Sequence, residues 1–310
     1  MNTIFMGTPQ FAATVLEALV NGGFKPAAVF TNPDKQSGRG HKLTELPVKT
    51  LAQSLGIPVY QPTTLKNNAE VIDTISEIQP DVIVVAAYGK ILPSEVINLP
   101  RLGCLNTHAS LLPKFRGASA INAAIREGEK KTGVTIMQIA PGLDTGDIIT
   151  AAATDIKDGE TVTELTARLA HIGGDLLVEV LNHLDNGERL TPTPQDDSLA
   201  TFVYPITKSE CRIDWDKPAD KVRNFIHSLS DNPAAFTEIS GKRLKVYRAD
   251  ITNETQDFAV GTVLIKKGLY VVCSNGETLK LTEVAPENGK RMSGAAFAAG
   301  AAKHNGVVLT

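Results

Sequence analysis

The chain has 310 residues, of which 42% are hydrophobic and 21% are charged, and its net charge is −3. This balance is ordinary for globular proteins, and the length suggests two domains. A slightly negative chain does not bind nucleic acid through its overall charge, so any RNA contact must come from a local cluster of cations. Three widely spaced cysteines without a CxxC pair argue against a disulfide framework or a zinc site.

The N-terminus lacks a basic stretch followed by an apolar core, so no signal peptide is visible. The longest clean apolar run, residues 82–87, is far shorter than the roughly 20 residues that span a bilayer. We therefore expect a cytoplasmic monomer with no membrane partner and no metal.

Strand and helix patterns alternate through the first half of the chain. Apolar runs and helical spacings predict these elements in turn: strands at 3–6, 27–31, 58–60, 81–86, 103–107, 133–139 and 147–153, and helices at 11–19, 46–55, 70–78, 118–126 and 161–184. The unbroken apolar run at 81–86 is typical of a strand buried on both faces. Such alternation predicts an α/β domain with a Rossmann-like, open and mostly parallel sheet that has helices on both faces.

The pattern changes after residue 188. Residues 189–208 show little periodicity and contain Pro192, Pro194 and Pro205, which indicates a linker. A helix at 219–228 and short strands at 235–239, 244–249, 261–265, 270–273 and 279–284 follow, with glycine turns between them. This spacing predicts a smaller OB-like β-barrel, so we divide the chain into domains 1–188 and 209–310.

The sequence Asn106-x-His108 stands where an apolar strand is expected to end. Ligands of open parallel sheets bind outside the carboxyl ends of the strands, and alternation sends both side chains to one face. Asp144 lies further on, in a loop flanked by Gly142 and Gly146. From spacing alone, a catalytic and a structural role for His108 are about equally favoured, and Asp144 is better interpreted as a turn residue.

Several segments carry a family resemblance. NTHASLLPKFRGASAI, beginning at Asn106, resembles the signature of the 10-formyltetrahydrofolate-dependent transformylases, and GVTIMQIAPGLDTGDII resembles their second motif. FMGTPQFA near the N-terminus and AYGKILP from Ala87 also fit. The resemblance extends over nearly the whole chain through the segments DKQSGRGHKLTELPVK and RIDW. These two segments are similar to those of the family members that formylate methionyl-tRNA.

The resemblance implies a role for each of these segments. Asn106, His108 and Asp144 would be catalytic, and no metal is implied. The formyl donor would be 10-formyltetrahydrofolate, a reduced folate, held by Ser110, Leu111, Leu112 and Pro113 and by backbone near Ala87, Tyr88 and Gly89. The acceptor would be charged initiator methionyl-tRNA, contacted by Lys35, Arg39, His41 and Lys42 of the basic segment at 35–42.

The residue types suit formyl transfer. Attack of an amine on the formyl carbon gives a tetrahedral intermediate that bears an oxyanion, and the Asn106 amide and a His108 N–H are suitable donors to it. His108 can also move a proton, with Asp144 to orient or charge the imidazole. No covalent nucleophile is needed.

Other functions stay open at this point. Met6-Gly7-Thr8-Pro9 is not the GxGxxG of a dinucleotide-binding loop, which disfavours a dehydrogenase. A formyltransferase for a small amine such as an amino-sugar nucleotide, a non-catalytic RNA-binding relative, and a hydrolase of formyl-folate all remain. By composition, the segment at 35–42 is a solvated loop; only the resemblance favours an insertion that enters tRNA.

Overall fold

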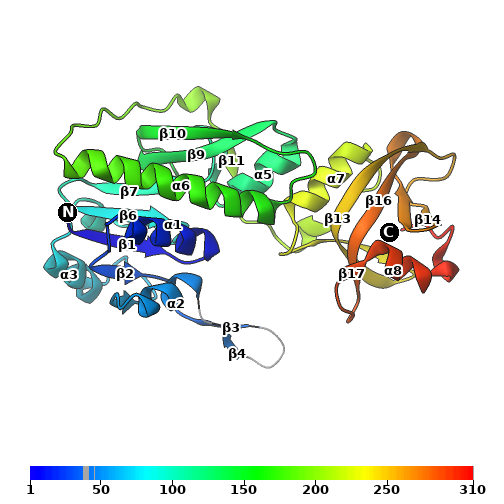
Figure 1. Cartoon of the computed structure of the whole chain (residues 1–310), viewed down its shortest axis with the longest axis horizontal. Coiled ribbons are helices and arrows are strands. Elements are labelled where there is room, and N and C mark those ends of the chain that lie inside the picture. The colour runs from blue at the N-terminus through cyan, green and yellow to red at the C-terminus, as the bar shows by residue number, and fades with distance from the viewer. Residues whose placement is uncertain (38–41, 45, 310) are drawn as a thin grey trace. The chain divides into compact units, whose positions relative to one another are not determined.

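The computed structural model describes residues 1–37, 42–44 and 46–309, and its contacts divide the chain into two units (Figure 1). The first unit comprises residues 1–120, 132–154 and 166–203, and the second comprises 121–131, 155–165 and 204–310. The segment 189–208, which the sequence predicts to be a linker, is divided between the units after Val203. The domain limits at 188 and 209 stay a prediction.

The first unit is built on a seven-stranded sheet in the order β10-β9-β7-β6-β1-β2-β5. Its strands are β1 (Thr3–Gly7), β2 (Ala28–Phe30), β5 (Val59–Tyr60), β6 (Val82–Ala86), β7 (Cys104–His108), β9 (Lys131–Gln138) and β10 (Ile148–Asp155). Neighbours from β7 to β5 run parallel, whereas β7 and β9 are antiparallel. The predicted Rossmann-like, mostly parallel sheet is confirmed.

Helices cover both faces of this sheet (Figure 1). They are α1 (Gln10–Asn21), α2 (Pro47–Ser54), α3 (Ala69–Ile78), α4 (Ser94–Ile97) and α6 (Val162–Asp185), whereas α5 (Ala120–Glu127) belongs almost entirely to the second unit. On one face α6 approaches closely through two glycines: a Cβ at Gly173 would lie 2.8 Å from Thr107 Cγ2, and one at Gly174 would lie 2.5 Å from Ala18 Cβ of α1. On the other face α3 and α4 pack Ile75 and Val96 against β-strand residues of a buried apolar cluster. The central strands of the sheet are therefore covered on both faces, whereas the edge strand β10 keeps exposed residues.

The basic segment forms a short hairpin of β3 (Lys35–Ser37) and β4 (Lys42–Thr44), with Ser37 opposite Lys42. Its sequence position between β2 and α2 places the hairpin at the carboxyl end of β2. Arg39 and His41 lie outside the described residues, and of Lys35 and Lys42 only the backbone is described.

The second unit contains an antiparallel, barrel-like sheet in the order β12-β13-β16-β15-β14, with β17 paired to β16. Its elements are α7 (Ala219–Ser228), β12 (Ala235–Ile239), β13 (Lys242–Thr255), β14 (Val263–Ile265), β15 (Leu269–Val272), β16 (Glu277–Pro286), β17 (Met292–Ser293) and α8 (Gly294–Ala299). The predicted strands are all present, but β13 runs six residues beyond the expected end at 249, and β17 and α8 were not expected. Register shifts around Arg248 let the long β13 bend while it stays paired to β16.

Cys104, Cys211 and Cys273 are buried free thiols. None of the helices that the structure describes is long and apolar enough to cross a membrane.

A buried histidine lies in the core of the second unit. His227 of α7 is 2% exposed, and its Nε2 accepts a hydrogen bond of 3.1 Å from the Ala249 backbone amide. Burial, and then the nearby cations Arg223 and Arg248, lower the pKa of His227 to about 4. Because a backbone amide can only donate, Nε2 must be unprotonated, and the folded protein holds this imidazole neutral.

We expect the second unit to lose stability when the pH falls from about 6.5 to 4. In this window the unfolded chain binds a proton at His227 and the folded chain does not, so acidification favours unfolding by on the order of 2–3 kcal/mol. Urea unfolding followed through Trp215, the single tryptophan of the chain and a buried residue of this unit, measures the effect.

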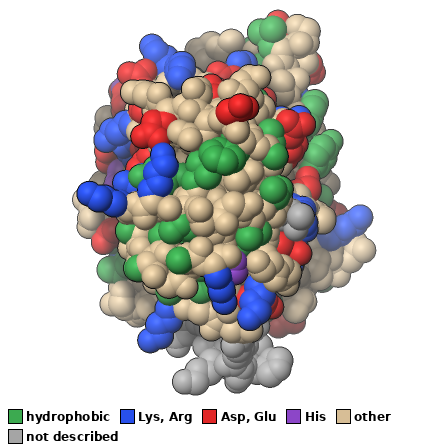
Figure 2. Space-filling view, turned by 90° about the vertical axis from the view of Figure 1, so that its right-hand side faces the viewer, with side chains coloured by type: hydrophobic (Ala, Val, Ile, Leu, Met, Phe, Trp, Pro, Cys, Tyr) green, Lys and Arg blue, Asp and Glu red, His purple; other side chains and the backbone are tan. Residues whose placement is uncertain are grey.

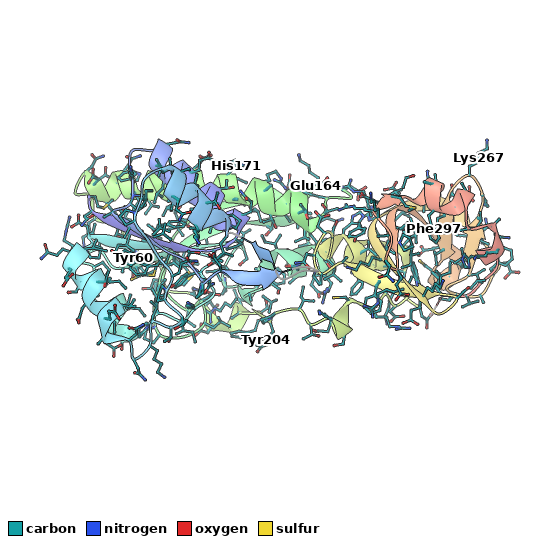
Figure 3. All side chains as sticks on the ribbon, turned by 90° about the horizontal axis from the view of Figure 1, so that it is seen from below. Tyr60, Glu164, His171, Tyr204, Lys267 and Phe297 are labelled. Atoms are coloured by element: carbon teal, nitrogen blue, oxygen red, sulfur yellow. The ribbon has the colours of Figure 1, made fainter. Side chains whose placement is uncertain are left out.

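His227→Gln keeps an acceptor near the Ala249 amide but cannot titrate, so its free energy of unfolding should fall less steeply over the same window. His171→Gln, at an exposed position of α6 (labelled in Figure 3), should keep the parental slope. Equal slopes for His227→Gln and the parent would show that His227 is not the group responsible.

Candidate active site

The carboxyl end of β7 carries Asn106 and His108 on one face. Asn106 lies between Val85 of β6 and Met137 of β9, and His108 lies opposite Thr135. Thr107, between them, points to α6, where Gly173 leaves room for it. Alternation therefore sends Asn106 and His108 to the opposite face, as the sequence predicted.

One hydrogen bond of His108 fixes its tautomer. Nε2 lies 3.0 Å from the Phe115 carbonyl oxygen, in a buried position. A carbonyl oxygen can only accept, so Nε2 carries the hydrogen, and in the neutral ring the lone pair is on Nδ1. Nδ1 lies 3.6 Å from Asp144 Oδ2, which is close enough for the carboxylate to stabilise a proton that arrives there.

Asp144 reaches His108 because its loop is held on several sides. The Gly117 backbone amide donates a hydrogen bond of 2.8 Å to Asp144 Oδ2. Asp144 itself has a left-handed backbone, with φ at 51°, which costs a residue with a Cβ about 1–2 kcal/mol. A Cβ at Gly146 would lie 1.8 Å from the Gln138 carbonyl oxygen, so this end of the loop requires glycine. The structure thus brings Asp144 to His108, although spacing alone favoured a turn role.

The Asn106 side chain is half-buried and has no hydrogen-bond partner among the residues that the structure describes. Its carboxamide hydrogens are therefore available to a ligand. His108 and Asp144 are 8% and 17% exposed, so this pair is partly desolvated, and a donor beside it acts strongly.

The four residues expected to hold folate form the turn after β7. Ser110 is fully buried, and its hydroxyl donates a hydrogen bond of 2.6 Å to the Lys114 carbonyl oxygen. Thr135 of β9 secures the turn: its Oγ1 donates to the Ser110 carbonyl oxygen at 2.7 Å and accepts from the Leu112 amide at 3.2 Å. The Ser110 side chain therefore shapes the turn, and Leu111 and Pro113 are its half-exposed members.

Residues 87–89 follow β6, the strand beside β7. Ala87 and Gly89 are exposed and have positive φ angles of 45° and 76°. Tyr88 is buried, which raises the pKa of its phenol to about 12, and its carbonyl oxygen accepts a hydrogen bond of 2.8 Å from Asn32 Nδ2. Asn32 thus holds this bend in place, a role that the sequence did not predict.

The structure also adds residues that sequence reasoning missed. Arg116, 2% exposed, donates to Gln195 Oε1 and to Asp197 Oδ1. Thr201 Oγ1 accepts from the Phe115 amide at 2.8 Å, and β11 (Phe202–Val203) pairs in parallel with β8 (Arg116–Gly117). Residues 195–203, part of the predicted linker, therefore brace the loop that contacts His108.

Comparison with known proteins identifies the family to which the chain belongs. Residues 1–181 match the formyl transferase family model, and residues 205–302 match the model of the formyl transferase C-terminal domain. Two curated relatives are the methionyl-tRNA formyltransferases of Neisseria meningitidis serogroup C, 44% identical over 100% of both chains, and of Caldanaerobacter subterraneus subsp. tengcongensis, 43% identical over 94% of both. This chain belongs to the methionyl-tRNA formyltransferase family.

A solved formyltransferase shares the fold at low identity. The N-formyltransferase from Helicobacter canadensis, in complex with folinic acid and dTDP-3-aminofucose, superposes with a TM-score of 0.68 at 19% identity, covering 91% of this chain and 98% of its own. At this identity the likeness shows the fold alone. Within the family assignment, Asn106, His108 and Asp144 all fall inside the matched range 1–181, whereas Gln195 falls between the two matched ranges.

The two hydrogen bonds of Thr135 provide a stability test of the turn. Thr135→Val should reduce the free energy of unfolding by about 1–3 kcal/mol, because it leaves the buried Leu112 amide and Ser110 carbonyl oxygen without this partner. Denaturant unfolding followed by circular dichroism measures the loss.

Thr3 is the matched control for this substitution. It is 1% exposed on β1, and its hydroxyl has no hydrogen-bond partner among the described residues. Thr3→Val should therefore be neutral or stabilising. If Thr3→Val and Thr135→Val cost the same, the Thr135 hydroxyl does not hold the turn.

Proposed function

We propose that this chain transfers the formyl group of 10-formyltetrahydrofolate to the free amino group of initiator methionyl-tRNA. The observation that supports the proposal is the contact of His108 with Asp144 at the end of β7, two residues from Asn106, in a chain whose full-length relatives are methionyl-tRNA formyltransferases. Because charged tRNA is used in translation, the proposal also places the enzyme in the cytoplasm.

Asn106 acts on the oxygen of the formyl group. When the amine nitrogen adds to the formyl carbon, the oxygen gains negative charge, and the unpartnered Asn106 amide can donate to it. A preorganised donor of this kind in a water-poor site contributes about 3–4 kcal/mol to transition-state stabilisation.

His108 moves the proton. An amino group is partly neutral near pH 8, so the amine can attack as such and then lose a proton. Nδ1 of His108 accepts that proton, since Nε2–H is committed to Phe115, and the Asp144 carboxylate stabilises the resulting imidazolium. His108 then returns the proton to N10 of the folate as the carbon–N10 bond breaks, which leaves formylated amine and tetrahydrofolate with all atoms accounted for.

The donor and acceptor would approach from the strand ends. The exposed Ala87 and Gly89 follow β6, and the half-exposed Leu111 and Pro113 follow β7, the neighbouring strand that carries Asn106, so these residues suit a flat heterocycle. For the tRNA, the cations of the segment 35–42 remain the candidates, because phosphate contacts need clustered cations. The face shown in Figure 2 mixes Lys and Arg with Asp, Glu and apolar side chains.

The amino-sugar alternative shares this fold, as the Helicobacter enzyme shows, but two observations disfavour it here. The relatives that are 43–44% identical over the full chain are methionyl-tRNA enzymes. A small substrate also has no use for the basic segment 35–42. A transfer assay that offers charged initiator tRNA and an amino-sugar nucleotide side by side decides between them, and formate release without an acceptor would indicate hydrolysis.

Asn106→Ala and His108→Ala should each lower the rate of formyl transfer to methionyl-tRNA by roughly 10²–10³-fold, because each removes one stabilising group from the transition state. Single-turnover transfer at saturating folate and tRNA measures the step directly. Asn98→Ala and His171→Ala, at exposed positions of the same unit, are matched controls and should keep parental rates. Near-parental transfer by Asn106→Ala or His108→Ala would refute the assignment.

Arg39→Ala should weaken the use of tRNA and leave folate binding intact. Removing one phosphate contact should raise KM for methionyl-tRNA and reduce the slope of log affinity against log salt by about one. Titration of methionyl-tRNA over a range of salt concentrations measures both quantities, and Lys25→Ala, an exposed cation before β2, is the control. An unchanged KM and salt slope for Arg39→Ala would count against the segment 35–42 as a tRNA contact.

A further inference from the structure

The carboxamide of Gln195 fastens the loop that carries Asp144. Its Nε2 donates two hydrogen bonds, to the carbonyl oxygen of Asp144 at 2.9 Å and to that of Gly146 at 2.7 Å. Both amide hydrogens of Gln195 are therefore used on the two sides of Thr145. The left-handed backbone of Asp144 is held between these two bonds and the Gly117 amide.

The other end of the carboxamide is fixed by Arg116. Gln195 Oε1 accepts from Arg116 Nε at 3.1 Å and from Nη2 at 2.8 Å, and Nη2 also donates to Asp197 at 2.7 Å. A guanidinium only donates and a carbonyl oxygen only accepts, so the carboxamide has a single orientation that satisfies all its partners. A charge-assisted bond of this kind, here partly buried, is stronger than one between neutral groups.

Arg116 lies between the two residues whose backbone groups hold His108 and Asp144. The residue before it, Phe115, supplies the carbonyl oxygen that holds His108 Nε2, and the residue after it, Gly117, supplies the amide that holds Asp144 Oδ2. The guanidinium of the residue between them holds Gln195, which in turn holds the backbone of Asp144. One three-residue segment and one glutamine thus set the positions of both partners of the His108–Asp144 contact.

We propose that Gln195, locked in orientation by Arg116, is a positioning residue that keeps the Asp144 carboxylate against the His108 imidazole. The proposal rests on the proposed function, in which Asp144 stabilises the His108 proton. Gln195 acts through Asp144 and belongs to none of the groups assigned above to the donor or the acceptor.

Loss of the Gln195 amide should slow the chemical step and leave substrate binding unchanged. In Gln195→Ala the carbonyl oxygens of Asp144 and Gly146 can bond to water, so the loop can relax and Asp144 can move from His108. A misplacement of about 1 Å costs up to roughly 10²-fold in rate. We expect kcat to fall 10–100-fold, with KM for methionyl-tRNA and for 10-formyltetrahydrofolate within threefold of the parent.

Gln195→Glu separates this role from a simple brace on Arg116. The glutamate is the same size and keeps an acceptor for the guanidinium, but its second oxygen faces two carbonyl oxygens and repels them. If Gln195 positions Asp144, Gln195→Glu also loses at least tenfold in kcat; if Gln195 merely supports Arg116, the variant keeps parental kcat, and the proposal is overturned. Gln53→Ala and Gln53→Glu, at an exposed glutamine of α2, are the matched controls.

A double-mutant cycle with Asp144→Asn gives the decisive comparison. If Gln195 acts through Asp144, the double variant should have a kcat less than threefold below that of Asp144→Asn alone. Multiplicative losses would overturn the positioning role, as would parental kcat in Gln195→Ala alone while Asp144→Asn is impaired. Parental activity of Asp144→Asn itself would instead remove the proposed role of Asp144, so the two failures can be told apart.

Discussion

The hydrogen bond from the Gly117 amide to the Asp144 carboxylate joins two loops that belong to different strands of the sheet. One loop follows β7 and carries Phe115, which holds His108; the other follows β9 and carries Asp144. This bond helps to bring together an imidazole and an acid that lie 36 positions apart in the sequence. The Asn106–His108–Asp144 group, and the chemistry proposed for it, depend on this one connection between loops.

The surrounding structure makes the connection rigid. Asn106 and His108 stand on β7, a central strand covered by helices on both faces, so their backbone positions are fixed by sheet hydrogen bonds and by the close approach of α6 at Gly173. Thr135 holds the turn after β7, and residues 195–203 hold the Arg116–Gly117 strand from outside. Catalysis by preorganised groups requires such support, because donors aimed at a developing charge help only if they need not rearrange.

Much of the fold could be predicted from the sequence because it depends on local patterns. The apolar run at 81–86 and the helical spacings gave the order of elements, and Asn106-x-His108 could be placed on one face because a strand alternates. The Asp144 contact could not be predicted from spacing, since Gly142 and Asp144 look like an ordinary turn. The roles of Gln195 and Thr201 could not be predicted either, because their hydrogen-bond partners lie 49 to 86 positions away in the sequence. Both residues also lie in a polar, proline-containing stretch without periodicity. The strand at 244–249 was predicted, but the extension of β13 beyond residue 249 was not, because β13 bends at register shifts that leave no mark on hydrophobic alternation.

The proposed mechanism depends on where the formyl group binds, which a crystal structure with a stable 10-formyl analogue of tetrahydrofolate would show. We expect the formyl oxygen within about 3 Å of the Asn106 carboxamide nitrogen, the formyl carbon open to an amine beside His108 Nδ1, and Asp144 still bonded to the Gly117 amide. A formyl group bound away from the end of β7, with Asn106 pointing elsewhere, would contradict it.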